Sequence, residues 1–344
     1  MSTDKHGGLP VIDAGGSARD IGRRLGRFGA RAVHEYLRTT PAWAAIIAHA
    51  TDGRVTRMRD AVQSRFPDIF AELQGLAEGL ELPFDDVFAW NCRGDIASLA
   101  PDGCTTVQLP GLDPRLDPGL DIIVAHNEDG DPGLRGACGI LNAQPDRGAG
   151  FEAFVYPGSL PGHTFGVNDA GLVLTVNNIR PRVMGDGVPR MALARAVLDC
   201  ASLDSAVTVI HATPRAGAFH LTLAQIGDPR LLSVELTGSH CSVTRIAKPA
   251  LHANHLIHKA TADAPQIVTA SSGARQIRGN ALLADAGSRI DPIAILHDRH
   301  GDLPIYRCDP KDPDGENTLA TAMFTIGPDA VAWTIRNAPT MKKT

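Results

Sequence analysis

The chain has 344 residues, 43% of them hydrophobic and 21% charged, with 33 basic against 38 acidic side chains. This length predicts one large layered domain or two smaller ones, and the absence of a Lys/Arg-rich block argues against nucleic-acid binding. Six cysteines are too few for a disulfide scaffold, and no window reaches the roughly 18 apolar residues of a membrane span. Residues 1–8 lack the layout of a secretory signal. We therefore expect a cytoplasmic protein with reduced thiols and no membrane contact.

The first hundred residues are predicted to be helical. Ser17 is placed to cap the first helix, because apolar residues then recur at the helical period. Pro67 suits the first turn of a later helix that ends near Gly79. The expected helical segments are 21–33, 43–49, 55–66 and 67–79.

After Cys104 the pattern changes to short apolar or alternating runs bounded by Gly, Pro, Asn and Asp, as is typical of strands. Asn168–Gly171 predicts a hairpin turn, and residues 110–118 a turn-rich loop. The expected strands are 105–109, 121–126, 151–156, 163–167, 172–176, 219–226, 231–236, 241–246, 319–326 and 330–335. The expected helices are 190–200, 203–211, 272–284 and 292–297. This order predicts an α+β fold with sheets between helical layers, and residues 1–344 as a single domain.

The segment Asp102-Gly103-Cys104-Thr105-Thr106 opens the first of these strands. Gly103 can adopt backbone angles closed to other residues, which allows a tight or strained turn directly before the cysteine. Taken alone, a cysteine at the start of a strand is most often a small buried hydrophobe. It becomes a candidate nucleophile only with suitable partners elsewhere in the chain.

Several further segments accompany Cys104 along the chain. They are F-P-D-I-F-A-E-L-Q-G-L-A-E-G at 66–79, N-C-R-G-D at 91–95, N-E-D at 127–129, G-V-N-D-A-G-L at 166–172, T-V-N at 175–177 and L-H-A-N-H at 251–255. In this order and spacing they resemble the acyl-coenzyme A:6-aminopenicillanic-acid acyltransferase family of N-terminal-nucleophile hydrolases. The resemblance covers roughly residues 60–340. It implies a four-layer αββα sandwich, no cofactor and no metal.

The resemblance also implies that the chain cuts itself before Cys104. The Cys104 sulfur would attack the Gly103 carbonyl, and hydrolysis of the thioester would free Cys104 as a new N-terminus. The products would be a mainly helical chain, 1–103, and a chain that begins with the nucleophile, 104–344, associated with each other. A free α-amino group has a pKa of about 7.7–8, so it can serve as the general base of its own residue.

By position, Asn254 corresponds to the family's oxyanion asparagine and Asn177 to a second asparagine near the nucleophile, although Asn178 beside it leaves the register open. Asp129 corresponds to an aspartate expected to hold the Cys104 amine or the processing site. From residue type alone, Asn254 would more often cap a turn, and Asp129 opens a strong turn sequence.

Supporting roles fall to three residues near the cut. Arg93 and Asp95 fit a pattern in which the arginine pairs with a carboxylate, with a surface ion pair as the alternative. Thr105 follows the nucleophile directly. The candidates for an arginine that completes the site are Arg275, Arg278 and Arg336.

Three positions depart from the family pattern: Glu128 replaces an aromatic residue, Ala253 a threonine, and Asp95 a glutamate. These differences leave the substrate undefined. A Cys/His protease or a metal site lacks supporting spacing among the histidines. Those histidines are His126, His252, His255 and His258.

The pattern therefore predicts an N-terminal-cysteine amidohydrolase that cleaves a small linear amide through a thioester acyl-enzyme. One alternative is an acyltransferase that moves an acyl group from a CoA-type thioester to an amine. The other is an uncut, non-catalytic binding protein on the same scaffold. The expected partner is a small amide or acyl compound, and a homo-oligomer stays open.

Overall fold

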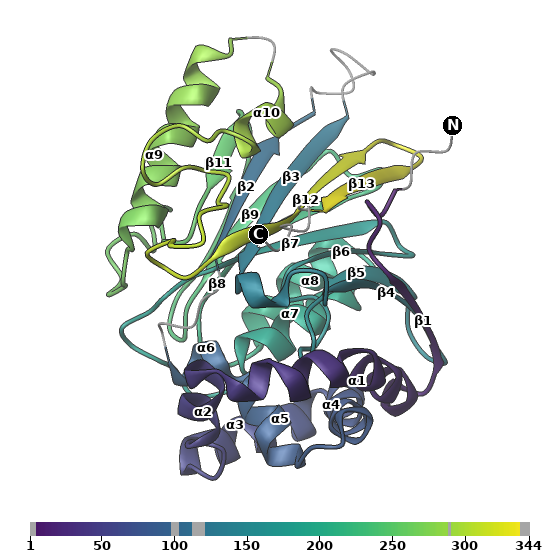
Figure 1. The fold of residues 1–344 in the computed structure, drawn as a ribbon. Helices are drawn as coiled ribbons and strands as arrows, with labels where there is room; N and C mark the ends of the chain where they lie inside the picture. The colour runs from purple at the N-terminus through teal and green to yellow at the C-terminus, as the bar shows by residue number, and fades with distance from the viewer. Residues whose placement is uncertain (1–4, 98–102, 112–120, 288–289, 338–344) are drawn as a thin grey trace.

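The computed structural model describes residues 5–97, 103–111, 121–287 and 290–337 (Figure 1). Two β-sheets are combined with ten α-helices in this part of the chain, which confirms the expected mixed α+β class. Asp102 and most of the expected loop at 110–118 lie outside the described residues.

The larger sheet, sheet A, has eight strands in the order β1-β4-β5-β6-β7-β8-β9-β10. They are β1 (Val11–Gly16), β4 (Gly139–Pro145), β5 (Phe151–Val155), β6 (Phe165–Asn168), β7 (Leu172–Asn178), β8 (Phe219–Gln225), β9 (Leu232–Leu236) and β10 (Cys241–Arg245). β1 pairs with β4 in parallel, and the other neighbours are antiparallel. The predicted hairpin joins β6 to β7, and Gly171 supplies the positive φ of +71° that its turn requires.

The smaller sheet, sheet B, has five strands in the order β11-β2-β3-β12-β13. They are β2 (Gly103–Leu109), β3 (Ile122–Gly130), β11 (Ala250–His252), β12 (Asn317–Ile326) and β13 (Val331–Asn337). β2 is an interior strand, paired with β11 on one side and β3 on the other. β3 pairs with the whole of β2, including Cys104, whereas β11 pairs only with Thr106–Gln108.

Helices cover the outer sides of the two sheets. The N-terminal group is α1 (Ala18–Glu35), α2 (Pro41–Ile47), α3 (Gly53–Arg65), α4 (Pro67–Leu80), α5 (Phe84–Asn91) and α6 (Arg93–Ile96), with a 3₁₀ turn η1 (Leu37–Thr39). The others are α7 (Arg190–Leu198), α8 (Leu203–Ala212), α9 (Ala270–Asp285), α10 (Pro292–Leu296) and the 3₁₀ turn η2 (Pro132–Leu134). Ser17 caps α1 as predicted, because its side chain accepts a hydrogen bond from the Asp20 amide. None of the described helices is both long and apolar enough to cross a membrane.

Three apolar clusters set this layering. One joins helices α1–α5, α7 and α8 to one face of sheet A, for example Leu25 and Leu174. A second fills the space between the sheets, where Phe165 of sheet A stands edge-on to Phe324 of sheet B. A third packs α10 on the outer face of sheet B. Figure 1 accordingly shows α1–α5 on one side of the sheets and α9 and α10 on the other.

Helices α1 and α4 cross at unusually short range. A Cβ atom on Gly22 of α1 would overlap the carbonyl oxygen of Glu72, and one on Gly75 of α4 would overlap that of Arg19. The two backbones touch at this crossing because glycine leaves the helix surfaces open.

The expectation that the first hundred residues are entirely helical is wrong at Val11–Gly16. This segment is β1, and it is held by its parallel pairing with β4, more than a hundred residues away. β4 and β11 were also not expected. Such short segments carry too little periodic signal, and their partners, not their own propensities, hold them extended.

Candidate active site

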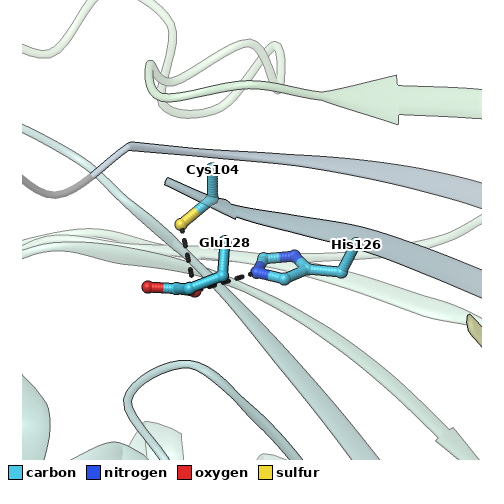
Figure 2. A group of neighbouring side chains, drawn as sticks. All are labelled: Cys104, His126 and Glu128. Carbon is cyan, nitrogen blue, oxygen red and sulfur yellow. Dashed lines mark hydrogen bonds and ion pairs between the residues drawn. The ribbon is translucent and has the colours of Figure 1, made fainter. Parts of the chain in front are cut away.

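The register of β2 and β3 assembles the centre of the site. Cys104 lies directly opposite Glu128, and Thr106 directly opposite His126. Because side chains alternate along a strand, these four share one face of sheet B. Thr106 contacts Asn177 of β7, so this face is turned toward sheet A. Figure 2 shows the side chains of Cys104, His126 and Glu128 pointing toward one another, and Cys104 is only 3% exposed.

The Asn177 amide fixes the positions of the protons in this layer. Its Nδ2 donates to the backbone carbonyl of His252 at 3.1 Å, which leaves Oδ1 as an acceptor. Oδ1 accepts from Thr106 Oγ1 at 2.7 Å and from His220 Nδ1 at 3.0 Å. The single hydroxyl proton of Thr106 therefore points to Asn177.

The imidazole of His126 must then donate through Nδ1 to Thr106 Oγ1, 2.8 Å away. Burial lowers the pKa of His126 to about 3, so the ring is neutral and its Nε2 carries no proton. Nε2 lies 3.1 Å from Oε2 of Glu128, and a hydrogen bond between them requires the proton to reside on the Glu128 carboxyl.

Glu128 connects this pair to the cysteine. Its Oε2 accepts from Cys104 Sγ at 3.6 Å, and its Oε1 accepts from the Tyr156 hydroxyl at 2.9 Å. One oxygen thus faces both the thiol and the bare nitrogen of His126. This arrangement can take the thiol proton onto Glu128 while the carboxyl proton moves to His126.

The same three residues could hold a metal ion. Cys104 Sγ, a ring nitrogen of His126 and a Glu128 oxygen lie within 4.8 Å of one another, and zinc accepts this donor set. In this structure the three side chains are linked by hydrogen bonds, with Glu128 Oε2 in contact with both the Cys104 thiol and His126 Nε2.

Asn254 and Arg275 hold Cys104 from the other side. The backbone N–H of Cys104 donates to Asn254 Oδ1 at 3.0 Å, and Arg275 Nη2 donates to the same oxygen at 2.7 Å. Arg275 Nη1 donates to the Cys104 carbonyl at 2.5 Å and to Thr105 Oγ1 at 2.8 Å. Asn254 Nδ2 donates to the carbonyl of Asn178 at 3.0 Å. Asn254 therefore presents its oxygen, not its N–H, to the nucleophile in this state.

Of the three candidate arginines, Arg275 is the one that contacts Cys104. It is buried in α9, whereas Arg278 forms an ion pair with Asp298 and Arg336 lies exposed on β13. Sequence spacing left these three equivalent, because the packing of α9 against sheet B decides among them.

Gly103 is an extended residue of β2 paired with Asp129, and its φ is not positive. The tight turn that glycine allows is therefore not made by Gly103 itself. A Cβ atom at this position would overlap the carboxylate of Glu316, so a larger residue would have to displace the ion pair between Glu316 and Arg307.

Asp129 is buried opposite Gly103. Its Oδ1 accepts from Thr318 Oγ1 at 2.6 Å, and Oδ2 has no hydrogen-bond partner within the described chain. Burial raises its pKa, and the charges of Arg275 and Arg307 oppose that shift. Its role toward the Cys104 amine stays a prediction.

A cavity of about 10 Å³ adjoins the nucleophile, which is about the space of one water molecule. Its lining includes Cys104, Glu128, Arg93 and Asn178. Asn178, rather than Asn177, is thus the asparagine at the cavity, while Asn177 organises the hydrogen bonds behind it. The catalytic role predicted for Asn177 stays untested.

The predicted supporting residues Arg93 and Asp95 form hydrogen bonds with different groups. Arg93 Nη1 contacts the carbonyl of Trp90 and the hydroxyl of Ser159, both at 3.3 Å. Asp95 accepts from the backbone N–H of Arg190 at 3.1 Å, and burial raises its pKa to about 6. The guanidinium of Arg190 in turn donates to Asn178 Oδ1.

The sequence did not indicate that Tyr156, His126 and Arg190 belong to the site. It marked Glu128 only as a residue that differs from the aromatic residue of the family pattern. The H-x-E spacing of His126 and Glu128 was an available signal, because residues two apart on a strand share a face. Their contact with Cys104 depends on the register of β2 against β3, which the sequence does not display.

The fold and site define a mixed α+β protein with a buried cysteine at the start of an interior strand. A family model described as acyl-coenzyme A:6-aminopenicillanic acid acyl-transferase matches residues 117–338, well over half of the chain. The chain therefore belongs to that family.

One curated relative is the β-alanyl-dopamine/carcinine hydrolase of Drosophila melanogaster, 25% identical over 261 residues. The match covers 67% of this chain and 65% of that protein, so the chain spans about two thirds of its relative's length. Among solved structures, penicillin V acylase from Agrobacterium tumefaciens is similar with a TM-score of 0.38 and 17% identity, over 67% of this chain and 85% of that one.

Proposed function

We propose that the protein is an autoprocessed N-terminal-cysteine amidohydrolase that cleaves a small linear amide through a thioester acyl-enzyme. Family membership supports action on amides, and the relative named as a hydrolase of β-alanyl-dopamine and carcinine favours hydrolysis. The observation that carries the proposal is the position of Cys104. Its backbone N–H is held by Asn254, and its thiol lies 3.6 Å from a carboxyl group.

We further propose that the layers described above form the four-layer αββα sandwich of N-terminal-nucleophile hydrolases, built as one domain. The helical clusters outside each sheet and the apolar layer between the sheets support this assignment.

The first step is intramolecular. Cys104 Sγ adds to the Gly103 carbonyl carbon as the thiol proton passes to Glu128 and the carboxyl proton to His126. The C–N bond of the 103–104 peptide breaks, and the nitrogen takes up a proton returned by the same pair. Water then hydrolyses the thioester, which leaves a carboxylate on Gly103 and a free thiol on Cys104. The chains are 1–103 and 104–344.

After the cut, the α-amine of Cys104 becomes the base for substrate turnover. Asn254 Oδ1 already faces that nitrogen, and the unpaired Oδ2 of Asp129 is available to a positive charge nearby. Asn254 Nδ2 has two N–H donors, one of which is used on the carbonyl of Asn178, so the second is the one that would serve an oxyanion. One such donor is commonly worth about 3–4 kcal/mol in the transition state.

Acyl transfer from a thioester donor to an amine is the second candidate, because the family description names that reaction. The two candidates share the acyl-enzyme and differ in whether water or an amine accepts the acyl group. Incubating the processed protein with small acyl amides, and with acyl thioesters with and without an amine, separates them by product.

Intact-protein mass spectrometry tests processing. The 36.4 kDa chain should appear as two species that meet between Gly103 and Cys104. Cys104→Ala should stay whole and inactive, while Cys92→Ala, the matched change at another buried cysteine, should be cut and active. A single uncut wild-type chain whose Cys104 is unreactive to a thiol reagent would instead indicate a binding protein.

A further inference from the structure

A second, larger cavity of about 210 Å³ lies beside the nucleophile cavity. Its walls come from η1 and α2, from α5 and α6, from η2, and from the turn after β5. Most of the lining is apolar, and it includes Leu37, Ala42, Ala45, Ile46, Trp90 and Leu134. Ala45 is exposed, so the cavity reaches the surface beside α2.

The size of this cavity fits one ring. An apolar cavity of about 150 Å³ in another protein holds benzene, so this one has room for a ring and a short alkyl chain. A cavity lined mainly by apolar side chains with a few polar groups is typical of a small-molecule site.

Two side chains connect this cavity to the cysteine. Arg93 lines both cavities. Tyr156 lines the larger one, and its hydroxyl donates to Glu128, the residue in contact with Cys104 Sγ. A molecule in the larger cavity therefore lies one side chain away from the nucleophile.

The cavity also contains one carboxylate with an unused oxygen. Asp131 Oδ1 accepts from the Tyr36 hydroxyl at 2.7 Å and from the Gly133 amide at 2.8 Å. No residue in the described segments donates a hydrogen bond to its Oδ2. Burial beside this carboxylate raises the pKa of Tyr36, which keeps the phenol a neutral donor. The Arg93 guanidinium also lines the cavity, but its Nη1 donates to the Trp90 carbonyl and the Ser159 hydroxyl. A carboxylate held as Asp131 is, beside an apolar wall, favours a cation at its own end of the cavity.

We infer that this cavity binds the part of the amide substrate that carries an apolar, ring-sized group and a cationic amine a few bonds from the ring. Trp90, Leu134 and their apolar neighbours hold the ring, and Asp131 Oδ2 accepts from the ammonium group. This inference rests on the proposed function, since it names the substrate class of that enzyme.

Binding can be measured without turnover, in the uncut Cys104→Ala chain. The probes are phenethylamine, which has the ring and the cation, 2-phenylethanol, which lacks the charge, and ethylamine, which lacks the ring. Calorimetry should show phenethylamine binding about 10-fold or more tightly than either of the others. Equal affinity for phenethylamine and 2-phenylethanol would overturn the inference.

Two variants locate the site. Ala45→Leu fills part of the cavity from its exposed edge and should weaken phenethylamine by about 10-fold. Ala44→Leu is the matched control, because Ala44 is exposed on the same helix and does not line the cavity. Asp131→Asn should reduce phenethylamine binding to the level of 2-phenylethanol and leave the alcohol unchanged. Equal losses of affinity in Ala45→Leu and Ala44→Leu, or no loss in Asp131→Asn, would contradict the assignment.

Because these measurements use the uncut, inactive chain, they do not depend on processing. If the Cys104→Ala chain binds phenethylamine tightly but the wild-type chain is never cut, the proposed function is wrong and the binding site is still supported. If the wild-type chain is cut normally but the Cys104→Ala chain shows no preference for a ring and a charge, the binding site is wrong and the proposed function is still supported.

Discussion

Glu128 is the residue whose surroundings bear most directly on the first chemical step. In the uncut chain the nitrogen of Cys104 is an amide that donates to Asn254, so it cannot accept the thiol proton. Glu128 and His126 lie where that proton can go, and the direction of every hydrogen bond from Asn177 onward leaves Nε2 of His126 free to receive one.

Glu128→Gln should therefore slow processing by about 100-fold or more, within the range expected for loss of a general base. Glutamine keeps an acceptor for the Tyr156 hydroxyl but cannot take up the thiol proton. The measurement is the rate at which the 104–344 product appears by intact mass. Any fraction that does process should turn over normally, because its base is the new α-amine.

Glu152→Gln is the matched control for this change. Glu152 lies on β5, where it forms an ion pair with Lys5, and the substitution should leave the processing rate unchanged. Processing of Glu128→Gln at the wild-type rate would show that the thiol proton goes elsewhere.

At this scale the sequence supplied candidates but not their geometry. Cys104, Asn254 and Asp129 were reached through the resemblance, while alternation along a strand alone would have put His126 and Glu128 together. The orientation of Asn254, with its oxygen toward the Cys104 nitrogen, depends on hydrogen bonds from Arg275 and to Asn178. Those partners are distant in sequence, so no local pattern encodes them.

Among the elements, helices α1 and α4 cross with backbone against backbone. Gly75 faces the carbonyl oxygen of Arg19 with no room for a methyl group. Flexible side chains could move aside, but here the obstacle is backbone on both helices.

Gly75→Ala should lower the free energy of unfolding by about 3 kcal/mol or more, because the helices must separate to admit the methyl group. Gly273→Ala is the counterpart in the first turns of α9, where a Cβ atom would meet no atom within 4 Å. That change should stabilise the protein by about 0.5–1 kcal/mol. Urea denaturation of both variants measures the difference, and similar effects of the two would contradict the packing argument.

Elements with a strong internal period were predictable, and those fixed by a distant partner were not. The period of α1, its Ser17 cap and the Gly171 turn are local signals, and each is present in the structure. β1 is short and ends in two glycines, so only its pairing with β4 explains its extended form.

For the whole molecule, Glu235 is a buried charge that joins sheet A to the segment after β11. Burial by itself would raise the pKa of Glu235, but hydrogen bonds from His252, the Ile257 amide and Thr261 outweigh it and hold the pKa at about 2. His258 faces the same carboxylate, and its amide also donates to it.

This shift predicts the acid stability of the protein. The pKa in the folded state lies below the ordinary value of 4.5, so the contribution of Glu235 is complete above about pH 5 and is lost as the pH falls toward 2. The loss amounts to about 3 kcal/mol in the free energy of unfolding. Denaturant titrations at pH 6, 4 and 3 should show it in the wild type.

Glu235→Gln removes the titrating group, so its free energy of unfolding should fall less over the same pH interval. Glu152→Gln, at a part-exposed carboxylate, should keep the wild-type slope. Parallel pH dependence in the wild type and Glu235→Gln would mean that another group controls acid unfolding.

The pairing of β1 with β4 acquires a different meaning if the chain is severed at 103–104. The two strands then belong to separate polypeptides, and so do the helical and sheet surfaces that meet in the apolar cluster over sheet A. Folding before the cut is a first-order event, but reassembly after denaturation becomes second-order. The mature protein should therefore regain its structure at a rate that rises with concentration, while the Cys104→Ala chain regains it at a rate independent of dilution.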